Sequence, residues 1–207
     1  MSDPRTQIVG AGYDAMVDTW EDWVVQIEDD PRAEWRDELI ERLPEGARVV
    51  ELGCGGGTTE TRHLAQRFRL TGVDLSDEQL RRARERVPEA EFVQADFTSI
   101  DFESESLAAV VAFYSFNHVP RDLLAPLYAR VRRWLAPDGL FLTALGTSDT
   151  ENWTGEWLGT TMYFSSFPPA VNSRMLRDAG FELLRDEIVT FREPEGPARF
   201  QWILARV

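Results

Sequence analysis

The sequence contains no lysine and only one cysteine, Cys54, among its 207 residues. A single cysteine excludes an internal disulfide and any zinc site built on several cysteines. Long apolar runs are also missing, because the longest, residues 107–114, is far shorter than a membrane-spanning helix. The first six residues carry no apolar signal region. These absences predict a cytoplasmic protein that does not enter the membrane.

Positive charge is scarce as well, since 22 basic residues stand against 36 acidic ones and the net charge is −14. The longest basic run is only Arg81-Arg82-Ala83-Arg84. The electric field of a negatively charged protein repels phosphate backbones, which makes nucleic acid an unfavourable partner. The length of 207 residues is typical of one domain with a substantial core.

Hydrophobic periodicity predicts an alternation of helices and strands along most of the chain. Two helices are expected within residues 13–43, where Trp20, Trp23 and Trp35 recur among apolar residues at helical spacing. Strands are expected at 48–52, 70–74, 91–95, 107–113 and 140–145, with helices at 58–68, 76–87 and 121–135 between them. Such alternation predicts a Rossmann-like, doubly wound α/β sheet.

The last third of the chain departs from this alternation. After a helix at 168–179, strands at 181–191 and 198–206 are joined by the short segment 193–197. So short a connection predicts that these two strands pair as an antiparallel hairpin.

A glycine-rich segment, Glu51-Leu52-Gly53-Cys54-Gly55-Gly56-Gly57, connects the first strand to the following helix. Glycines at this junction permit a tight turn and let a ligand approach the backbone, while the helix N-terminus favours electron-rich groups. The dinucleotide fingerprint requires a third glycine or alanine where Thr58 stands, so this segment matches that fingerprint poorly.

Two acidic residues follow the next two strands. Asp74 ends the second strand, and its carboxylate could accept hydrogen bonds from ribose hydroxyls. Asp96-Phe97 follows the third strand, where an acid beside an aromatic ring suits adenine. Because open α/β sheets bind ligands at the carboxyl ends of their strands, these residues and the glycine segment predict one shared site.

These motifs, in this order, resemble those of the class I S-adenosylmethionine-dependent methyltransferases that act on small molecules. The resemblance runs from residue 49 to 207 and includes 135–140, similar to the turn before the fifth strand. It implies a seven-stranded sheet with an antiparallel last strand, S-adenosyl-L-methionine as cofactor and S-adenosyl-L-homocysteine as product. We therefore expect one domain comprising an N-terminal helical cap (1–45), a cofactor-binding core (46–146) and a substrate segment with the C-terminal hairpin (147–207).

The resemblance also implies roles for individual residues. Asp74 would hold the ribose, Asp96 would bond the adenine amine between Leu75 and Phe97, and Tyr13 would close over the cofactor. The complete set of cofactor-binding residues implied in this way is Tyr13, Glu51, Gly53, Gly55, Gly57, Asp74, Leu75, Asp96, Phe97 and Phe113.

Methyl transfer from a sulfonium is an in-line displacement, and it can require a base that takes the acceptor's proton. His118, which follows the fourth strand, is either that catalytic base, a substrate anchor, or a structural residue that fastens its loop. Asn117 orients a polar substrate group or is a turn residue. The aromatic-rich residues 152–159 and 161–167 predict a pocket for an apolar or planar acceptor, with Trp157, Met162 and Tyr163 as candidates.

No carboxylate cluster suited to a metal ion is recognisable, so we expect no metal. Three functions remain open: a small-molecule methyltransferase, an NAD-dependent dehydrogenase, which Thr58 disfavours, and a non-catalytic or non-methylating protein that retains S-adenosylmethionine or S-adenosylhomocysteine binding. The sequence leaves open the identity of the acceptor, whether O, N, S or C is methylated, and whether the protein is a monomer or a homodimer.

Overall fold

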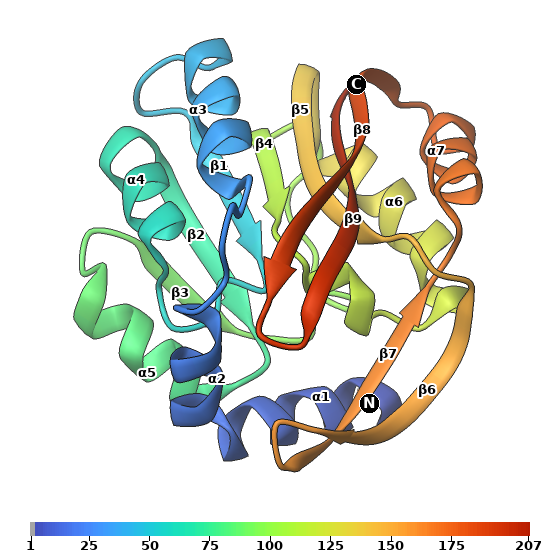
Figure 1. Ribbon diagram of the computed structural model, residues 1–207. Helices are drawn as coiled ribbons and strands as arrows, with labels where there is room; N and C mark the ends of the chain where they lie inside the picture. Colours follow the sequence, from blue (N-terminus) through green and yellow to red (C-terminus); the bar gives the residue numbers. More distant parts are fainter. Residues whose placement is uncertain (1–2) are drawn as a thin grey trace.

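The computed structural model describes residues 3–207, and a seven-stranded sheet forms its centre (Figure 1). The strand order is β3-β2-β1-β4-β5-β9-β8. Strands β1 to β5 are parallel, whereas β9 pairs antiparallel with both β5 and β8. The strands are β1 (Arg48–Leu52), β2 (Arg69–Asp74), β3 (Glu91–Gln94), β4 (Leu107–Ala112), β5 (Leu135–Gly146), β8 (Glu182–Glu193) and β9 (Gly196–Arg206). The predicted Rossmann-like sheet with an antiparallel last strand is confirmed.

Helices cover both faces of this sheet. The helices of the α/β core are α3 (Arg32–Arg42), α4 (Thr59–Arg67), α5 (Asp77–Arg86), α6 (Arg121–Trp134) and α7 (Pro169–Asp178). Side chains of α3 and α4 pack on one face with Val111 of β4, whereas side chains of α6 and α7 pack on the other with Val110. Because successive residues of a strand point to opposite faces, β4 must be apolar throughout to contribute to both cores.

Threonine and serine side chains set where two of these helices begin. Thr58 accepts a hydrogen bond from the backbone of Thr61 at the start of α4, and Ser76 accepts one from Gln79 at the start of α5. Thr58 directly follows the glycine segment after β1, and Ser76 follows Leu75, the single residue after β2. Each cap therefore fixes where a helix starts and where the preceding loop ends, at the carboxyl edge of the sheet.

The N-terminal region holds more helix than the sequence predicts. Helix α1 (Pro4–Ala15) precedes α2 (Val17–Val24), and a break at Met16 separates them. Asp3 caps α1 and Pro4 occupies its first turn, which is a helix-start signal that lies before the region assigned to helices from the sequence. The two helices predicted within residues 13–43 are present as α2 and α3, whereas α1, which begins at Pro4, was not predicted.

A second, two-stranded sheet also lies outside the predicted elements. Strands β6 (Thr150–Trp157) and β7 (Thr160–Ser166) form a hairpin in the segment expected to supply substrate loops. Its turn, Leu158-Gly159, has positive φ at both positions, as the favoured two-residue hairpin turns require. Figure 1 shows this hairpin, α1 and α2 gathered at the edge where the parallel strands end. Within residues 3–207, no helix is long and apolar enough to cross a membrane.

Candidate active site

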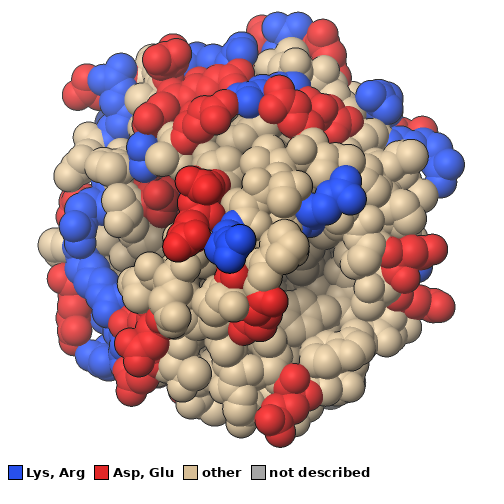
Figure 2. Space-filling view, viewed as in Figure 1, with Lys and Arg blue, Asp and Glu red and all other residues tan. Residues whose placement is uncertain are grey.

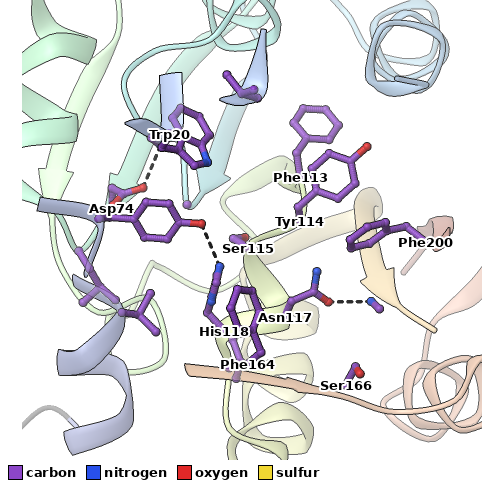
Figure 3. A pocket seen from close by; sticks show the side chains of 18 of the residues that line it. Trp20, Asp74, Phe113, Tyr114, Ser115, Asn117, His118, Phe164, Ser166 and Phe200 are labelled. Atoms are coloured by element: carbon purple, nitrogen blue, oxygen red, sulfur yellow. Dashed lines mark hydrogen bonds between the residues drawn. The ribbon is translucent and has the colours of Figure 1, made fainter. Parts of the chain in front are cut away.

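A cavity of about 370 Å³ lies at the carboxyl edge of the sheet, and its mouth is the hollow visible in Figure 2. The ends of β1, β2 and β3 line one half of the cavity, and the ends of β4, β5 and β9 line the other. Helices α1 and α2 and the β6–β7 hairpin cover the two halves. Figure 3 shows labelled side chains from these elements turned toward a common centre. The structure thus brings the glycine segment, Asp74 and Asp96 to one site, as the sequence predicts.

The glycine segment wraps around the carboxylate of Asp74. The backbone N–H of Gly55 donates to Asp74 Oδ2 at 2.8 Å, and the N–H of Ser76 donates to Oδ1 at 3.0 Å. Gly53 and Gly55 have φ of 76° and 55°, a region that disfavours residues with a Cβ. Each carboxylate oxygen retains a lone pair beyond these bonds, so Asp74 can accept further hydrogen bonds from a ligand in the cavity.

Glu51 supplies a second, buried carboxyl group to the same half of the cavity. Among the described residues, no hydrogen-bond partner reaches its Oε2 atom. Burial raises the pKa of Glu51 to about 8. A cationic group placed beside this carboxyl would stabilise its ionised form, so Glu51 fits a positively charged ligand.

The carboxylate of Asp96 already accepts hydrogen bonds from side chains of the protein, in addition to the contact with adenine that the sequence predicts. Thr6 donates from α1 to Asp96 Oδ2 at 2.8 Å, and the Thr98 hydroxyl donates to Oδ1 at 2.6 Å. The neighbouring Phe97 ring stacks on Phe116 with 5.6 Å between ring centroids. Leu75, Asp96 and Phe97 nevertheless line the cavity, so their proposed contact with adenine stays a prediction.

His118 is buried, and both of its ring nitrogens are engaged. Nδ1 lies 2.9 Å from the carbonyl oxygen of Tyr163, and only a protonated nitrogen can donate to a carbonyl. Nε2 is therefore unprotonated and accepts the hydroxyl proton of Tyr13 at 3.0 Å (Figure 3). Burial lowers the pKa of His118 to about 4, so the ring is neutral at physiological pH. This arrangement favours the structural interpretation of His118, as the residue that holds Tyr13 in place.

The depressed pKa of His118 predicts a specific pH dependence of stability. The unfolded chain binds a proton at His118 below its ordinary pKa near 6.5, whereas the folded chain does so only below about 4. Stability is therefore lost as pH falls from 6.5 towards 4. Between pH 7 and 5, wild type should lose about 2 kcal/mol more unfolding free energy than His118→Gln, measured by urea denaturation. Equal losses in the two proteins would show that His118 is not held neutral.

Several predicted site residues lie outside the cavity. Met162 is fully buried against α1, and an added Cβ at Gly12 would lie 2.2 Å from its sulfur, so it is a packing residue. The Tyr163 hydroxyl donates to Asn152 at 2.7 Å, and the Tyr163 carbonyl oxygen accepts from His118. Tyr163 therefore affects the cavity only through His118. Gly57 does not line the cavity either, and a Cβ there would lie 3.0 Å from Ala83 of α5. Neither Met162 nor Tyr163 is thus placed to contact an acceptor directly.

The remaining predicted residues do line the cavity, together with others that the sequence did not single out. Tyr13, Phe113, Asn117 and Trp157 are in place. The additional lining residues come from the N-terminal helices and from the strand ends, and they include Thr6, Trp20, Trp23, Tyr114, Ser166, Arg199 and Phe200. Periodicity identified the tryptophans as helix residues, but only tertiary contacts show which of them face the site.

Cys54 is buried within the glycine segment, and burial raises the pKa of its thiol. A thiol with a raised pKa is a poor nucleophile, which agrees with a packing role. In the part of the chain that the structure describes, no three histidine, cysteine or acidic side chains are grouped to hold a metal ion.

Residues 49–139 match the family model of a methyltransferase domain. Trans-aconitate 2-methyltransferase of Variovorax paradoxus is 37% identical over 119 residues, which are 54% of this chain and 44% of that protein. Fatty-acid O-methyltransferase of Mycolicibacterium smegmatis is 38% identical over 104 residues, which are 47% of this chain and 36% of that protein. The chain thus matches less than half the length of these curated relatives.

Solved structures share the whole architecture. A crystal structure of Burkholderia thailandensis 1,6-didemethyltoxoflavin-N1-methyltransferase, with bound 1,6-didemethyltoxoflavin and S-adenosylhomocysteine, has a TM-score of 0.71. The similarity covers 100% of this chain and 91% of that one, at 21% sequence identity. At this level of identity the similarity shows a common fold.

Proposed function

This chain belongs to the class I S-adenosylmethionine-dependent methyltransferase family, and from that premise we propose that it transfers a methyl group to a small-molecule acceptor by in-line displacement. The proposal rests mainly on one observation: the glycine segment folds around Asp74 at one end of a cavity, and the cavity continues past both of them. The curated relatives support a small acceptor, since their names refer to trans-aconitate and to fatty acids.

The residues of the first half of the cavity fit an adenosyl cofactor. Asp74 has lone pairs for ribose hydroxyls, and Gly53 and Gly55 leave the backbone accessible. The unpartnered Oε2 of Glu51 fits the positive charge of a methionine-derived group. When bound, S-adenosylmethionine supplies a methyl group already activated by a sulfonium.

The protein's task is to position the reacting groups and exclude water. Tyr13 and Trp20 cover the cavity from the N-terminal helices, with 6.2 Å between their ring centroids. His118 fixes the Tyr13 hydroxyl, and burial together with the negative charge of Asp74 raises the pKa of Tyr13. Tyr13 therefore stays protonated and serves as a cover over the site, with His118 as its positioning residue.

Methyl transfer can be tested with S-adenosylmethionine labelled in its methyl group and a library of small acceptors. The expected result is S-adenosylhomocysteine formed in proportion to a labelled small product, only when an acceptor is present. Binding of S-adenosylhomocysteine without turnover for any acceptor would favour the alternative function, a protein that binds the cofactor but does not methylate. A labelled protein or nucleic acid would contradict the proposed acceptor class.

We further expect a cytoplasmic monomer or homodimer that requires neither a metal ion nor nucleic acid. The net charge of −14 supports the last expectation, because it opposes contact with phosphate backbones. Size-exclusion chromatography with light scattering distinguishes the two oligomeric states.

A further inference from the structure

The tip of the β8–β9 hairpin projects beyond the carboxyl edge of the central sheet. Pairing between β5 and β9 ends at Gly146 and Phe200, whereas β8 and β9 stay paired as far as Glu193 and Gly196. Phe200 pairs with Val189, and at about 3.3 Å per residue Glu193 lies about 13 Å further out along the hairpin. Figure 1 shows this tip reaching toward the N-terminal helices. It lines the outer end of the half of the cavity formed by β4, β5 and β9, here called the acceptor half.

Glu193 turns its side chain into the acceptor half. In an antiparallel hairpin, directly paired residues and every second residue along a strand share one face. Glu193 therefore shares a face with Phe191 and Phe200, and all three line the cavity. Arg199 also borders the cavity, but it pairs with Thr190 and is exposed on the opposite face. The hairpin thus presents two aromatic rings and one carboxyl group to the acceptor half.

Within residues 3–207, the carboxyl group of Glu193 has neither a hydrogen-bond partner nor an ion-pair partner. The nearby carboxylates are both engaged. Glu195 accepts the indole N–H of Trp23 at 2.9 Å, and Asp30 accepts the hydroxyl proton of Tyr114 at 3.0 Å. Burial, with the negative charges of Glu195 and Asp30, raises the pKa of Glu193 to about 7. A positively charged group beside Glu193 would stabilise its ionised form.

The protein supplies no such positive group at this point. The chain contains no lysine, and the buried arginine of the cavity, Arg32, lies 2.7 Å from the carboxylate of Asp30. The guanidinium of Arg32 also lies over the Tyr114 ring, 5.6 Å from its centroid. Among the described residues, no arginine influences the pKa of Glu193. The outer end of the acceptor half therefore offers a carboxyl group to a cation that a ligand would bring.

The inner end of the acceptor half offers a hydrogen-bond donor instead. Asn117 Oδ1 accepts the backbone N–H of Gly146 at 2.7 Å, which assigns the amide orientation because only the oxygen can accept that proton. Figure 3 shows the Nδ2 atom of Asn117 turned toward the centre of the cavity. The rings of Tyr114, Phe200 and Phe191 form a wall from here outward, with 4.7 Å and 5.7 Å between successive centroids. The acceptor half is thus polar at both ends and aromatic between them.

We propose that the acceptor is an elongated amine whose ammonium group binds Glu193 and whose apolar body lies along the aromatic wall; this inference rests on the proposed methyltransferase function. An ammonium group supplies both the positive charge and the N–H donors that an unpartnered carboxylate binds. Because Glu193 stands at the outer end, away from the residues proposed to hold the cofactor, the ammonium group is recognised but not methylated. The methylated atom lies at the other end of the molecule, near Asn117.

Three probes of equal chain length test this preference: 4-phenylbutylamine, 4-phenylbutan-1-ol and 4-phenylbutanoate. They differ in the terminal group, which is cationic, neutral or anionic at pH 7. Affinity is measured by isothermal titration calorimetry with S-adenosylhomocysteine at saturation. We expect the amine to bind about tenfold more tightly than the alcohol, and the carboxylate to bind most weakly. An amine that binds no more tightly than the alcohol, or a carboxylate that binds best, would overturn the inference.

Variants locate the ammonium group within the cavity. Glu193→Gln keeps the size of the side chain but removes its charge, and should bring the amine within about twofold of the alcohol. Glu193→Lys should reverse the order, so that the carboxylate binds best. Because Glu193 makes no bond within the described chain, circular dichroism should show both variants folded.

Glu182→Gln is the matched control, because it removes the same charge from the same strand outside the cavity. Glu182 lies 2.6 Å from Arg206 at the far end of β8, and loss of such an exposed pair has little effect on folding. This variant should keep the tenfold preference for the amine. If Glu193→Gln kept the preference too, or if both variants lost it equally, the net charge of the protein and not Glu193 would select the amine.

Titration with S-adenosylhomocysteine alone separates two levels of failure. If wild type binds it but shows no preference for the amine probe, the inference about the acceptor fails and the proposed function stands. If wild type does not bind it, the proposed function fails as well.

Discussion

Replacement of Asp74 by alanine is expected to weaken S-adenosylhomocysteine binding by about 1.5–3 kcal/mol, which corresponds to a rise in Kd of roughly tenfold to 150-fold. The ribose hydroxyls would lose a charged acceptor that the fold places at the end of β2. The N–H of Gly55, now bonded to Asp74 at 2.8 Å, would lose its partner too, so the loop would be less well ordered for the ligand. Isothermal titration calorimetry measures this change.

Asp74→Asn is the matched control for this variant. It retains the size of the side chain and one acceptor oxygen, but loses the charge and the second acceptor. Its affinity should lie between those of wild type and Asp74→Ala, and circular dichroism should show both variants folded. Unchanged affinity in folded Asp74→Ala would remove the ribose contact from the proposed site.

Replacement of Gly53 by alanine is expected to lower the free energy of unfolding by about 3 kcal/mol and to abolish detectable S-adenosylhomocysteine binding. Gly53 has φ of 76°, which costs a residue with a Cβ roughly 1–2 kcal/mol. The added Cβ would also lie 2.3 Å from Cβ of Ser115, whose hydroxyl donates to the Leu52 carbonyl at 2.6 Å. The loops after β1 and β4 would therefore have to separate at the floor of the cavity.

Gly46→Ala separates backbone strain from this steric conflict. Gly46 has a similar φ of 73°, but no heavy atom would lie within 4 Å of its added Cβ. Its variant should lose about 1 kcal/mol in urea denaturation and bind S-adenosylhomocysteine normally. If Gly53→Ala were no more destabilised than Gly46→Ala, then the close approach to Ser115 would not be a constraint on this loop.

The α/β core was predictable because its signals are local and agree with one another. Apolar β4, the capping residues Thr58 and Ser76 and the glycines after β1 each favour the same arrangement. The β6–β7 hairpin was missed because β6 has no consistently apolar face: Trp153 and Trp157 share their face with Glu151 and Gly155, and Trp153 is 41% exposed. Such a pattern also describes a binding loop, and only the pairing partner distinguishes the two.

The same difference between local signals and tertiary contacts applies to the site residues. The placement of Asp74 and Asp96 at the cavity could be predicted because a strand end fixes their position in any doubly wound sheet. Met162 was wrongly expected to contact the acceptor because an aromatic-rich segment does not reveal which side chains face inwards, and it packs against α1.

Calorimetric titration of the whole chain with S-adenosylhomocysteine, and separately with NAD, tests most directly whether the cavity is a methyltransferase cofactor site. Micromolar binding of S-adenosylhomocysteine with one molecule per chain, and no heat of binding for NAD, is the predicted result. Binding of NAD instead, or of neither compound by the folded protein, would contradict it.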